Sequence, residues 1–87
     1  MREYTVNGSN MLTKSDAHAE LASALEIKDY YGANLDALYD VLGGFRGRIR
    51  LINTVQMLNG LKGYGCKILK TLFDAASENE YITLIIE

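Results

Sequence analysis

Apolar and polar positions follow two different periods along this chain, and the two periods predict a mixed α/β domain. Three short segments carry the β-branched and aromatic residues, or the alternation, of strands. Four other segments place apolar residues three or four positions apart, which is typical of amphipathic helices. The predicted strands are Glu3–Val6, Arg48–Ile52 and Tyr81–Ile86, and the predicted helices run through Ser15–Leu25, Asn34–Leu42, Val55–Leu61 and Tyr64–Glu78. Because helical segments separate the strands, each return needs a crossover, which predicts a small two-layer domain with a three-stranded parallel sheet.

The two later strands differ in pattern. The segment Arg48–Ile52 alternates polar and apolar residues, which predicts a half-buried strand with Ile49 and Leu51 inward and its arginines on an open face. Tyr81–Ile86 is a nearly continuous apolar run, which predicts a strand buried on both sides. We expect helices to cover one face of the sheet and to leave much of the other open. The strand order does not follow from the pattern.

Local signals give expectations for helix ends and for single residues. Ser15 and Thr54 are candidate N-caps, because a hydroxyl can accept a hydrogen bond from a first-turn amide. His18 is expected to be a solvated surface residue, and Cys66 a small buried one. The residues of the last helix that are expected to face inward are Ile68, Leu69, Leu72, Phe73 and Ala76.

One stretch, YYGANLDALYDVLGG at residues 30–44, holds the clearest helix signals. Asn34 is a strong N-cap residue, and Gly43–Gly44 are expected to end the helix as glycines commonly do. Between them Leu35, Leu38 and Leu42 form one apolar stripe. The stretch therefore predicts a compact helix with one face in the core.

The opposite face of this helix is acidic. At roughly 100° per residue, Asp36 and Asp40 lie close together, and Tyr39 borders them. Like charges four residues apart repel by roughly 0.2–0.5 kcal/mol, and Asp40 also lies in the last turn, where the helix dipole disfavours an anion. A local rule that is broken without visible compensation indicates a functional site.

The pattern YYGxNLDALxD, followed by glycine and an aromatic residue, resembles the signature helix of the barstar family, intracellular inhibitors of the ribonuclease barnase. The resemblance implies a protein that blocks a barnase-like, guanyl-specific ribonuclease by inserting this helix and the loop before it into the active site. It implies that Asp40 takes the place of an RNA phosphate, that Asp36 is a second anion, and that Tyr30 stacks on a catalytic histidine. The other contact residues that it implies are Asn34, Tyr39, Gly43, Gly44, Phe45 and, by a looser match, Asp74.

The chain departs from the family pattern at several positions. Ala33 stands where the founding member has an acid, and Tyr39 and Phe45 replace tryptophans. Positive charge follows directly after the binding helix, at Arg46, Arg48 and Arg50. A very basic ribonuclease would be repelled by these arginines, which indicates a less basic target or a different approach.

Composition narrows the classes of protein. The 87 residues, 48% hydrophobic and with a net charge of −2, predict one domain over residues 1–87 and no membrane span. A single cysteine and no apolar leader indicate a cytoplasmic protein. We expect a monomer with no metal and no cofactor. An enzyme is not expected, because Asp36 and Asp40 project from one helix in a similar direction and so do not flank a substrate bond.

Two alternatives to a ribonuclease inhibitor stay open. The arginines at 46, 48 and 50 could serve an RNA- or protein-binding regulatory module, although no aromatic residues interleave them as single-strand binding would require. The same acidic helix could also belong to an immunity protein against a toxin that is not a ribonuclease. Nucleic acid is not expected as a partner of the inhibitor itself.

Overall fold

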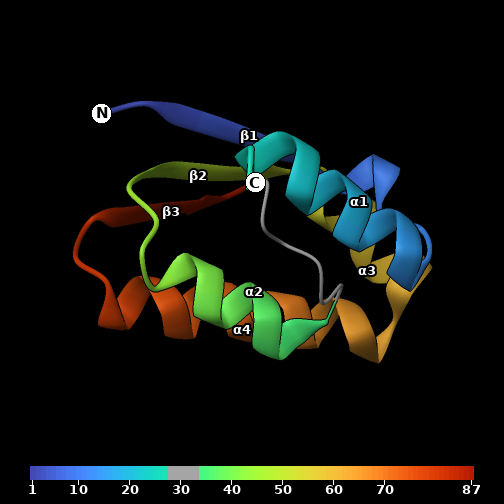
Figure 1. The fold of residues 1–87 in the computed structure, drawn as a ribbon. Helices are drawn as coiled ribbons and strands as arrows, with labels where there is room; N and C mark the ends of the chain where they lie inside the picture. Colours follow the sequence, from blue (N-terminus) through green and yellow to red (C-terminus); the bar gives the residue numbers. More distant parts are fainter. Residues whose placement is uncertain (28–33) are drawn as a thin grey trace.

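The computed structural model describes residues 1–27 and 34–87, and these form a mixed α/β fold (Figure 1). Within them, three strands share one sheet and four α-helices pack against it. The elements in chain order are β1 (Glu3–Asn7), the 3-10 helix η1 (Gly8–Asn10), α1 (Lys14–Leu25), α2 (Leu35–Leu42), β2 (Gly47–Ile52), α3 (Thr54–Leu61), α4 (Gly63–Glu78) and β3 (Ile82–Ile86). The predicted fold class is confirmed.

The sheet is parallel throughout and has the order β1-β2-β3. The register pairs Tyr4 with Ile49 and Ile49 with Leu84, so that these three side chains lie in one row across the sheet. Spatial order thus follows chain order, and the strand that alternates most clearly, β2, is the central one.

One face of the sheet carries the core. Val6, Ile49 and Leu51 are fully buried and point to the same side, and the helices cover that side in Figure 1. Helices α2 and α4 run side by side beneath the sheet, and α4 contacts β3. The opposite face is mostly polar and carries Glu3, Thr5, Arg48, Arg50 and Thr83. The expected half-open sheet, with Ile49 and Leu51 inward, is confirmed.

The prediction that the last strand is buried on both sides is wrong. β3 is an edge strand, because β2 occupies the centre of the sheet. Ile82 is buried, but Thr83 is exposed and the rest of the strand is half-buried. Tyr81 lies before the strand and is 48% exposed. A continuous apolar run is therefore compatible with an edge position when one row of its side chains is only partly covered.

Two helix starts differ from the prediction. Thr13, not Ser15, caps α1, and its hydroxyl oxygen accepts a hydrogen bond from the Asp16 amide at 3.1 Å. At α3 the N-cap is Asn53, in a left-handed conformation with φ 54°. Thr54 lies inside that helix and is buried, and its hydroxyl has no hydrogen-bond partner among the described residues. Only Asn53 lies between the end of β2 at Ile52 and the start of α3 at Thr54, so Asn53 takes the N-cap position and Thr54 becomes the first residue of the helix.

Two residues of α4 face solvent against expectation. Cys66 is exposed, and Phe73 is 54% exposed. The helix buries Ile68, Leu72 and Ala75, which lie four and three residues apart. Cys66 and Phe73 are two turns apart on the opposite side, so both turn away from the core.

His18 is also placed differently from the prediction, because it is 4% exposed rather than solvated. Its Nε2 lies 2.5 Å from the hydroxyl of Tyr64 on α4, and the two rings meet edge to face at 5.8 Å. Lys14 stands over the same tyrosine ring, with its ammonium nitrogen 4.8 Å from the centroid. The histidine therefore joins α1 to the first turn of α4.

This contact predicts a pH-dependent stability. Burial lowers the pKa of His18 below its ordinary value of 6.5, because the charged imidazolium loses solvation. The unfolded chain then binds this proton more readily, so the free energy of unfolding falls as the pH drops through 6.5 and below. We expect urea denaturation at about pH 7.5 and about pH 5.5 to show this loss in the wild type and a smaller one in His18→Gln. Equal losses in both proteins would contradict the assignment.

Candidate functional site

Helix α2 is held rigidly by its cap and its apolar face. The Asn34 side chain accepts a hydrogen bond from the Ala37 amide at 2.8 Å, which satisfies one orphan donor of the first turn. Leu38 and Leu42 are fully buried in the core, and Leu35 packs against it. The predicted capped helix with one apolar stripe is confirmed. Its polar face is consequently fixed in direction.

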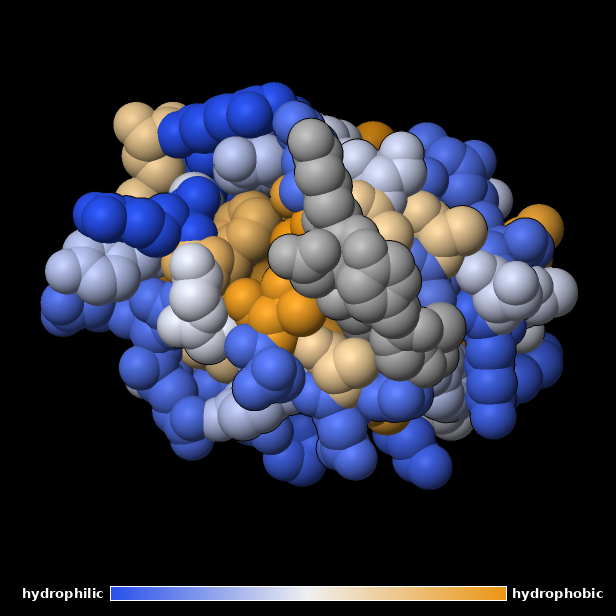
Figure 2. Space-filling view, in the orientation of Figure 1, coloured by the Kyte–Doolittle hydropathy of each residue, from blue (hydrophilic) through white to orange (hydrophobic). Residues whose placement is uncertain are grey.

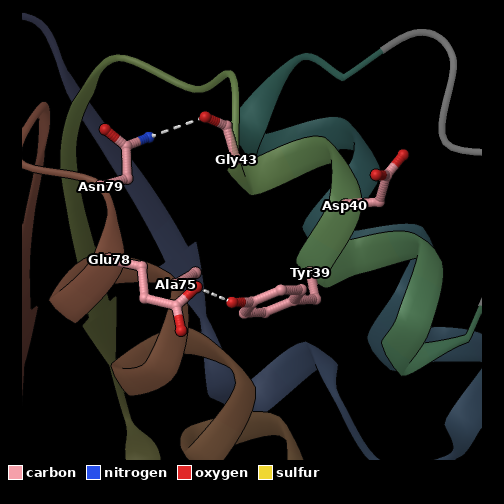
Figure 3. Close-up of a pocket in the computed structure, with 6 residues that line it drawn as sticks. All are labelled: Tyr39, Asp40, Gly43, Ala75, Glu78 and Asn79. Carbon is pink, nitrogen blue, oxygen red and sulfur yellow. Dashed lines mark hydrogen bonds between the residues drawn. The ribbon is translucent and has the colours of Figure 1, made fainter.

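That polar face borders a hollow between α2 and α4 (Figure 3). The hollow has a volume of about 220 Å³ and is lined by Tyr39, Asp40, Gly43, Ala75, Glu78 and Asn79. The Tyr39 hydroxyl donates a hydrogen bond to the Glu78 carboxylate across it. This bond raises the pKa of Tyr39, because ionisation would remove the donated proton and place two anions together. Asp40 is exposed at the rim, with its carboxylate directed away from the Tyr39–Glu78 pair.

A second hollow, of about 300 Å³, lies on the other side of Tyr39. Asp36 contributes from α2 and Asp74 from α4, and Asp74 accepts a hydrogen bond from the Lys70 ammonium at 2.7 Å. We call Asp36, Asp40, Asp74 and Glu78 the acidic surface. In the view of Figure 2, the lower part of the molecule over α2 and α4 is mostly hydrophilic, below a central area of apolar side chains.

Within the acidic surface, the charges are not equally compensated. Asp74 has its ion pair with Lys70. For Asp36 and Asp40, no basic side chain of residues 1–27 or 34–87 lies within ion-pair distance. Within the described residues, these two carboxylates are therefore exposed on a core-anchored helix without an ion-pair partner.

Asn79, which sequence analysis did not single out, holds the end of α2 against the end of α4. Its Nδ2 donates to the carbonyl oxygens of Leu42 at 2.9 Å and Phe45 at 2.8 Å, with a longer contact of 3.4 Å to Gly43. Its Oδ1 accepts a hydrogen bond from the Tyr81 amide at 2.9 Å. The available signal was an asparagine directly after a helix, where its side chain commonly bonds backbone groups.

Helix α2 ends at Leu42 with Gly43 as its C-cap, which confirms the predicted glycine ending, but the glycine does not adopt the left-handed conformation that is common at this position. Gly43 is right-handed, with φ −60° and ψ −28°, and Gly44 does not have a positive φ either. The side chain of Asn79 satisfies carbonyls that a left-handed glycine would otherwise help to satisfy. At Gly44 an added Cβ would meet nothing within 4 Å. Both glycines are exposed, and they leave the backbone beside Asp40 accessible.

The remaining sequence-predicted site residues have different surroundings. Phe45 is 9% exposed, and its ring packs edge to face on Tyr4 at 5.0 Å, so its side chain belongs to the core rather than to the acidic surface. Asn34 and Tyr39 lie on the outside of α2. Tyr30 and Ala33 lie outside the described residues.

The three arginines do not form one uncompensated patch. Arg48 lies 3.7 Å from Glu3, and Arg50 lies 3.9 Å from Glu3 and also pairs with Glu87. The guanidinium of Arg50 lowers the pKa of the Glu87 carboxyl. The parallel register sets Glu3 beside Arg48 and so partly neutralises the open face of the sheet. Arg46 instead stacks on Tyr81, with its guanidinium carbon 4.2 Å above the ring centroid.

This pairing predicts weak or no RNA binding by the open sheet face. The double variant Arg48→Ala, Arg50→Ala should behave like the wild type toward a single-stranded RNA oligonucleotide, because the carboxylates of Glu3 and Glu87 lie beside the two guanidinium groups and lower the positive potential of this face. Fluorescence anisotropy at low salt would measure this. Salt-sensitive RNA binding by the wild type that the double variant loses would contradict the prediction and favour the RNA-binding alternative.

The described residues form neither a membrane-spanning helix nor a metal-binding group of side chains. No helix in the described part of the chain is both long and apolar enough to cross a membrane. Among the same residues, no group of three or more His, Cys, Asp or Glu side chains is placed to hold a metal ion.

A capped helix with an acidic face, packed beside a parallel sheet, makes this an α/β domain, and comparison with known proteins gives its family. The profile of the Barstar (barnase inhibitor) family matches residues 1–83, so the chain belongs to the barstar family. A Bacillus subtilis (strain 168) protein described as "Putative ribonuclease inhibitor YrdF" is 40% identical to it over 45 residues. The match covers 52% of this chain and 50% of that protein, so the chain spans about half the length of the relative.

Proposed function

We propose that this protein is a monomeric, cytoplasmic inhibitor of a barnase-like, guanyl-specific ribonuclease and is not itself an enzyme. The acidic surface, together with the segment that precedes α2, would fill the active site of the ribonuclease. The observation that carries the proposal is the pair of exposed carboxylates, Asp36 and Asp40, without ion pairs among the described residues on a helix anchored in the core. Membership of the barstar family and the description of the Bacillus subtilis relative support the same class.

The proposed mechanism is mimicry of RNA by charge. A ribonuclease active site gathers basic side chains around the positions of the RNA phosphates, and carboxylates placed at those positions form charge-assisted hydrogen bonds with them. Asp40, at the rim of the hollow, would be the central phosphate mimic, and Asp36, one turn earlier, would be the second anion. Asp74 and Glu78 would add negative potential from α4. RNA is then excluded because its phosphate sites are occupied.

The rigidity of the surface favours tight binding. The Tyr39–Glu78 hydrogen bond and the Asn79 contacts fix α2 against α4 before any partner arrives. A preorganised surface loses less conformational entropy on association than a mobile one. Tyr39 and Asn34 would border the charged contact, and the exposed Gly43 and Gly44 would let the partner approach the backbone closely. Tyr30 would stack on a catalytic histidine, and Phe45 would support the contact from the core side.

The direct test is an inhibition titration. Purified protein is added to barnase, and to a panel of other small guanyl-specific ribonucleases, with a fluorogenic RNA substrate. We expect activity to fall stoichiometrically for at least one enzyme, with a ribonuclease of a different fold as the uninhibited control. Full activity of every enzyme in the presence of folded protein would reject the proposal.

A further inference from the structure

Two more hollows lie beside the acidic surface, and the residues that line them come from the end of the molecule where α2 and α4 end and β2 and β3 begin. Figure 1 shows these four element ends on the same side of the molecule. The hollow beside Asp40 shares Gly43, Glu78 and Asn79 with a neighbouring hollow of about 500 Å³, which Tyr81 also lines. Tyr81 in turn lines a further hollow, of about 260 Å³. Asp40 and Tyr81 are therefore connected by one continuous, indented surface.

This further hollow, which Tyr81 lines, differs from the others because all of its charged side chains are basic. It is lined by Met1, Arg2, Arg46, Gly47 and Tyr81, which lie just before or at the first residues of the three strands. A parallel sheet brings these positions together, since all strands begin at the same edge. We call it the cationic hollow.

The floor of the cationic hollow is tightly built. Gly47 has φ 149°, and a Cβ there would come within 2.7 Å of the Tyr4 ring and 3.0 Å of the Arg2 carbonyl oxygen. The Arg48 amide donates to that same carbonyl oxygen at 2.8 Å. Backbone in this packing cannot shift easily, so the chain positions from which Arg2 and Arg46 project are fixed relative to each other.

Of the two arginine side chains that line this hollow, Arg46 is the one without an ion pair among the described residues. Its guanidinium carbon lies over the Tyr81 ring, 4.2 Å from the ring centroid, and no carboxylate of residues 1–27 or 34–87 is within ion-pair distance of it. Arg2, by comparison, is paired with Glu26. Stacking on an aromatic ring occupies the face of a guanidinium and leaves its N–H edge free for two parallel hydrogen bonds to a carboxylate or phosphate.

We infer that the cationic hollow takes a carboxylate side chain of the ribonuclease, with Arg46 as a specificity-determining contact; the inference rests on the proposed function. The partner would then present basic groups to the acidic surface and one acidic group beside them. An enzyme with only basic residues at that rim would bring like charges together at Arg46 and would be discriminated against. This arrangement assigns a role to the positive charge that follows the acidic helix.

A single carboxylate fits the surroundings better than an RNA strand does. Glu78 and Glu80 line the adjacent hollow, and they would repel the phosphates of a chain that ran across it. Arg48 and Arg50, the nearest further arginines in the sequence, are occupied by Glu3 and Glu87. One unpaired guanidinium, beside an arginine that Glu26 already pairs and close to Glu78 and Glu80, can bind one anion but does not provide the row of cations that an RNA strand needs.

The test compares Arg46→Ala with Arg48→Ala, a matched loss of one exposed arginine two residues further along the chain, on the open face of the sheet. Dissociation constants are measured for each panel ribonuclease that the wild-type protein inhibits. We expect Arg46→Ala to weaken binding by about tenfold or more, since interfacial arginines are often hot spots, and Arg48→Ala to change it by less than about twofold. Tyr81→Leu, which removes the stacking platform but keeps Arg46, should weaken binding by a smaller factor.

A second experiment identifies the carboxylate of the ribonuclease that Arg46 contacts. Each Asp or Glu around the ribonuclease active site is replaced by alanine. For one of these enzyme variants, Arg46→Ala should cause almost no further change in the dissociation constant. Wild-type affinity in a folded Arg46→Ala protein, while Asp40→Ala loses inhibition, would overturn this inference and leave the proposed function in place. Salt-sensitive binding of an RNA oligonucleotide that Arg46→Ala abolishes would also overturn it. No inhibition by the wild type would reject both.

Discussion

Asp40→Ala is expected to raise the dissociation constant for the target ribonuclease about 30-fold or more, which corresponds to a loss of at least about 2 kcal/mol. Asp40 is exposed at the rim of the hollow between α2 and α4, and none of the described basic side chains pairs with it. Its removal therefore costs the free protein little and leaves a cationic group of the enzyme without its anion in the complex. The effect should be larger than that of any other single truncation on the acidic surface.

The measurement is a set of inhibition titrations with matched variants. Asp40→Asn keeps the shape of the side chain and removes only its charge, so it should lose nearly as much affinity as Asp40→Ala. Asp36→Ala, one turn away on the same helix, should lose less, because it would contact the rim and not the centre of the active site. A folded Asp40→Ala protein with wild-type affinity would exclude charge mimicry centred on this residue.

Asn79→Ala is expected to reduce the free energy of unfolding by about 2–3 kcal/mol, because the part-buried carbonyl oxygen of Phe45 loses its side-chain donor and that of Leu42 keeps only the Phe45 amide. The lost bonds are those to the carbonyl oxygens of Leu42 and Phe45, together with the one accepted from the Tyr81 amide. These bonds join the last turn of α2 to the turn after α4. The variant should also bind the ribonuclease more weakly, since the end of α2 that carries Asp40 loses its support.

Urea denaturation monitored by circular dichroism would measure the change in stability. Asn79→Asp retains the acceptor for the Tyr81 amide but lacks both N–H donors, so most of the loss should persist in it. Ser77→Ala is the control, because the Ser77 hydroxyl donates only to Asp74 within the same helix. A change below about 0.5 kcal/mol in Asn79→Ala would mean that the side chain is not a structural clamp.

The sequence predicted those features of the fold and of the candidate site that depend on residues close together in the chain. The period of β2, the Asn34 cap and the stripe of Leu35, Leu38 and Leu42 are set by residues within a few positions of one another, and all three match the structure. The face shared by Asp36 and Asp40 follows from the same helical spacing. The general architecture was also accessible, because strands separated by helices require parallel pairing.

The sequence alone therefore determined the fold class, the capped helix and its acidic face. The tertiary structure decided the burial of His18 against Tyr64, the edge position of β3, the clamp of Asn79 on α2, and the different surroundings of Arg46 and Arg48. Each of these depends on groups more than 30 positions apart, such as His18 with Tyr64 and Asn79 with Phe45. Periodicity reports which side of an element is apolar, but the partner that a polar side chain meets depends on how the elements pack.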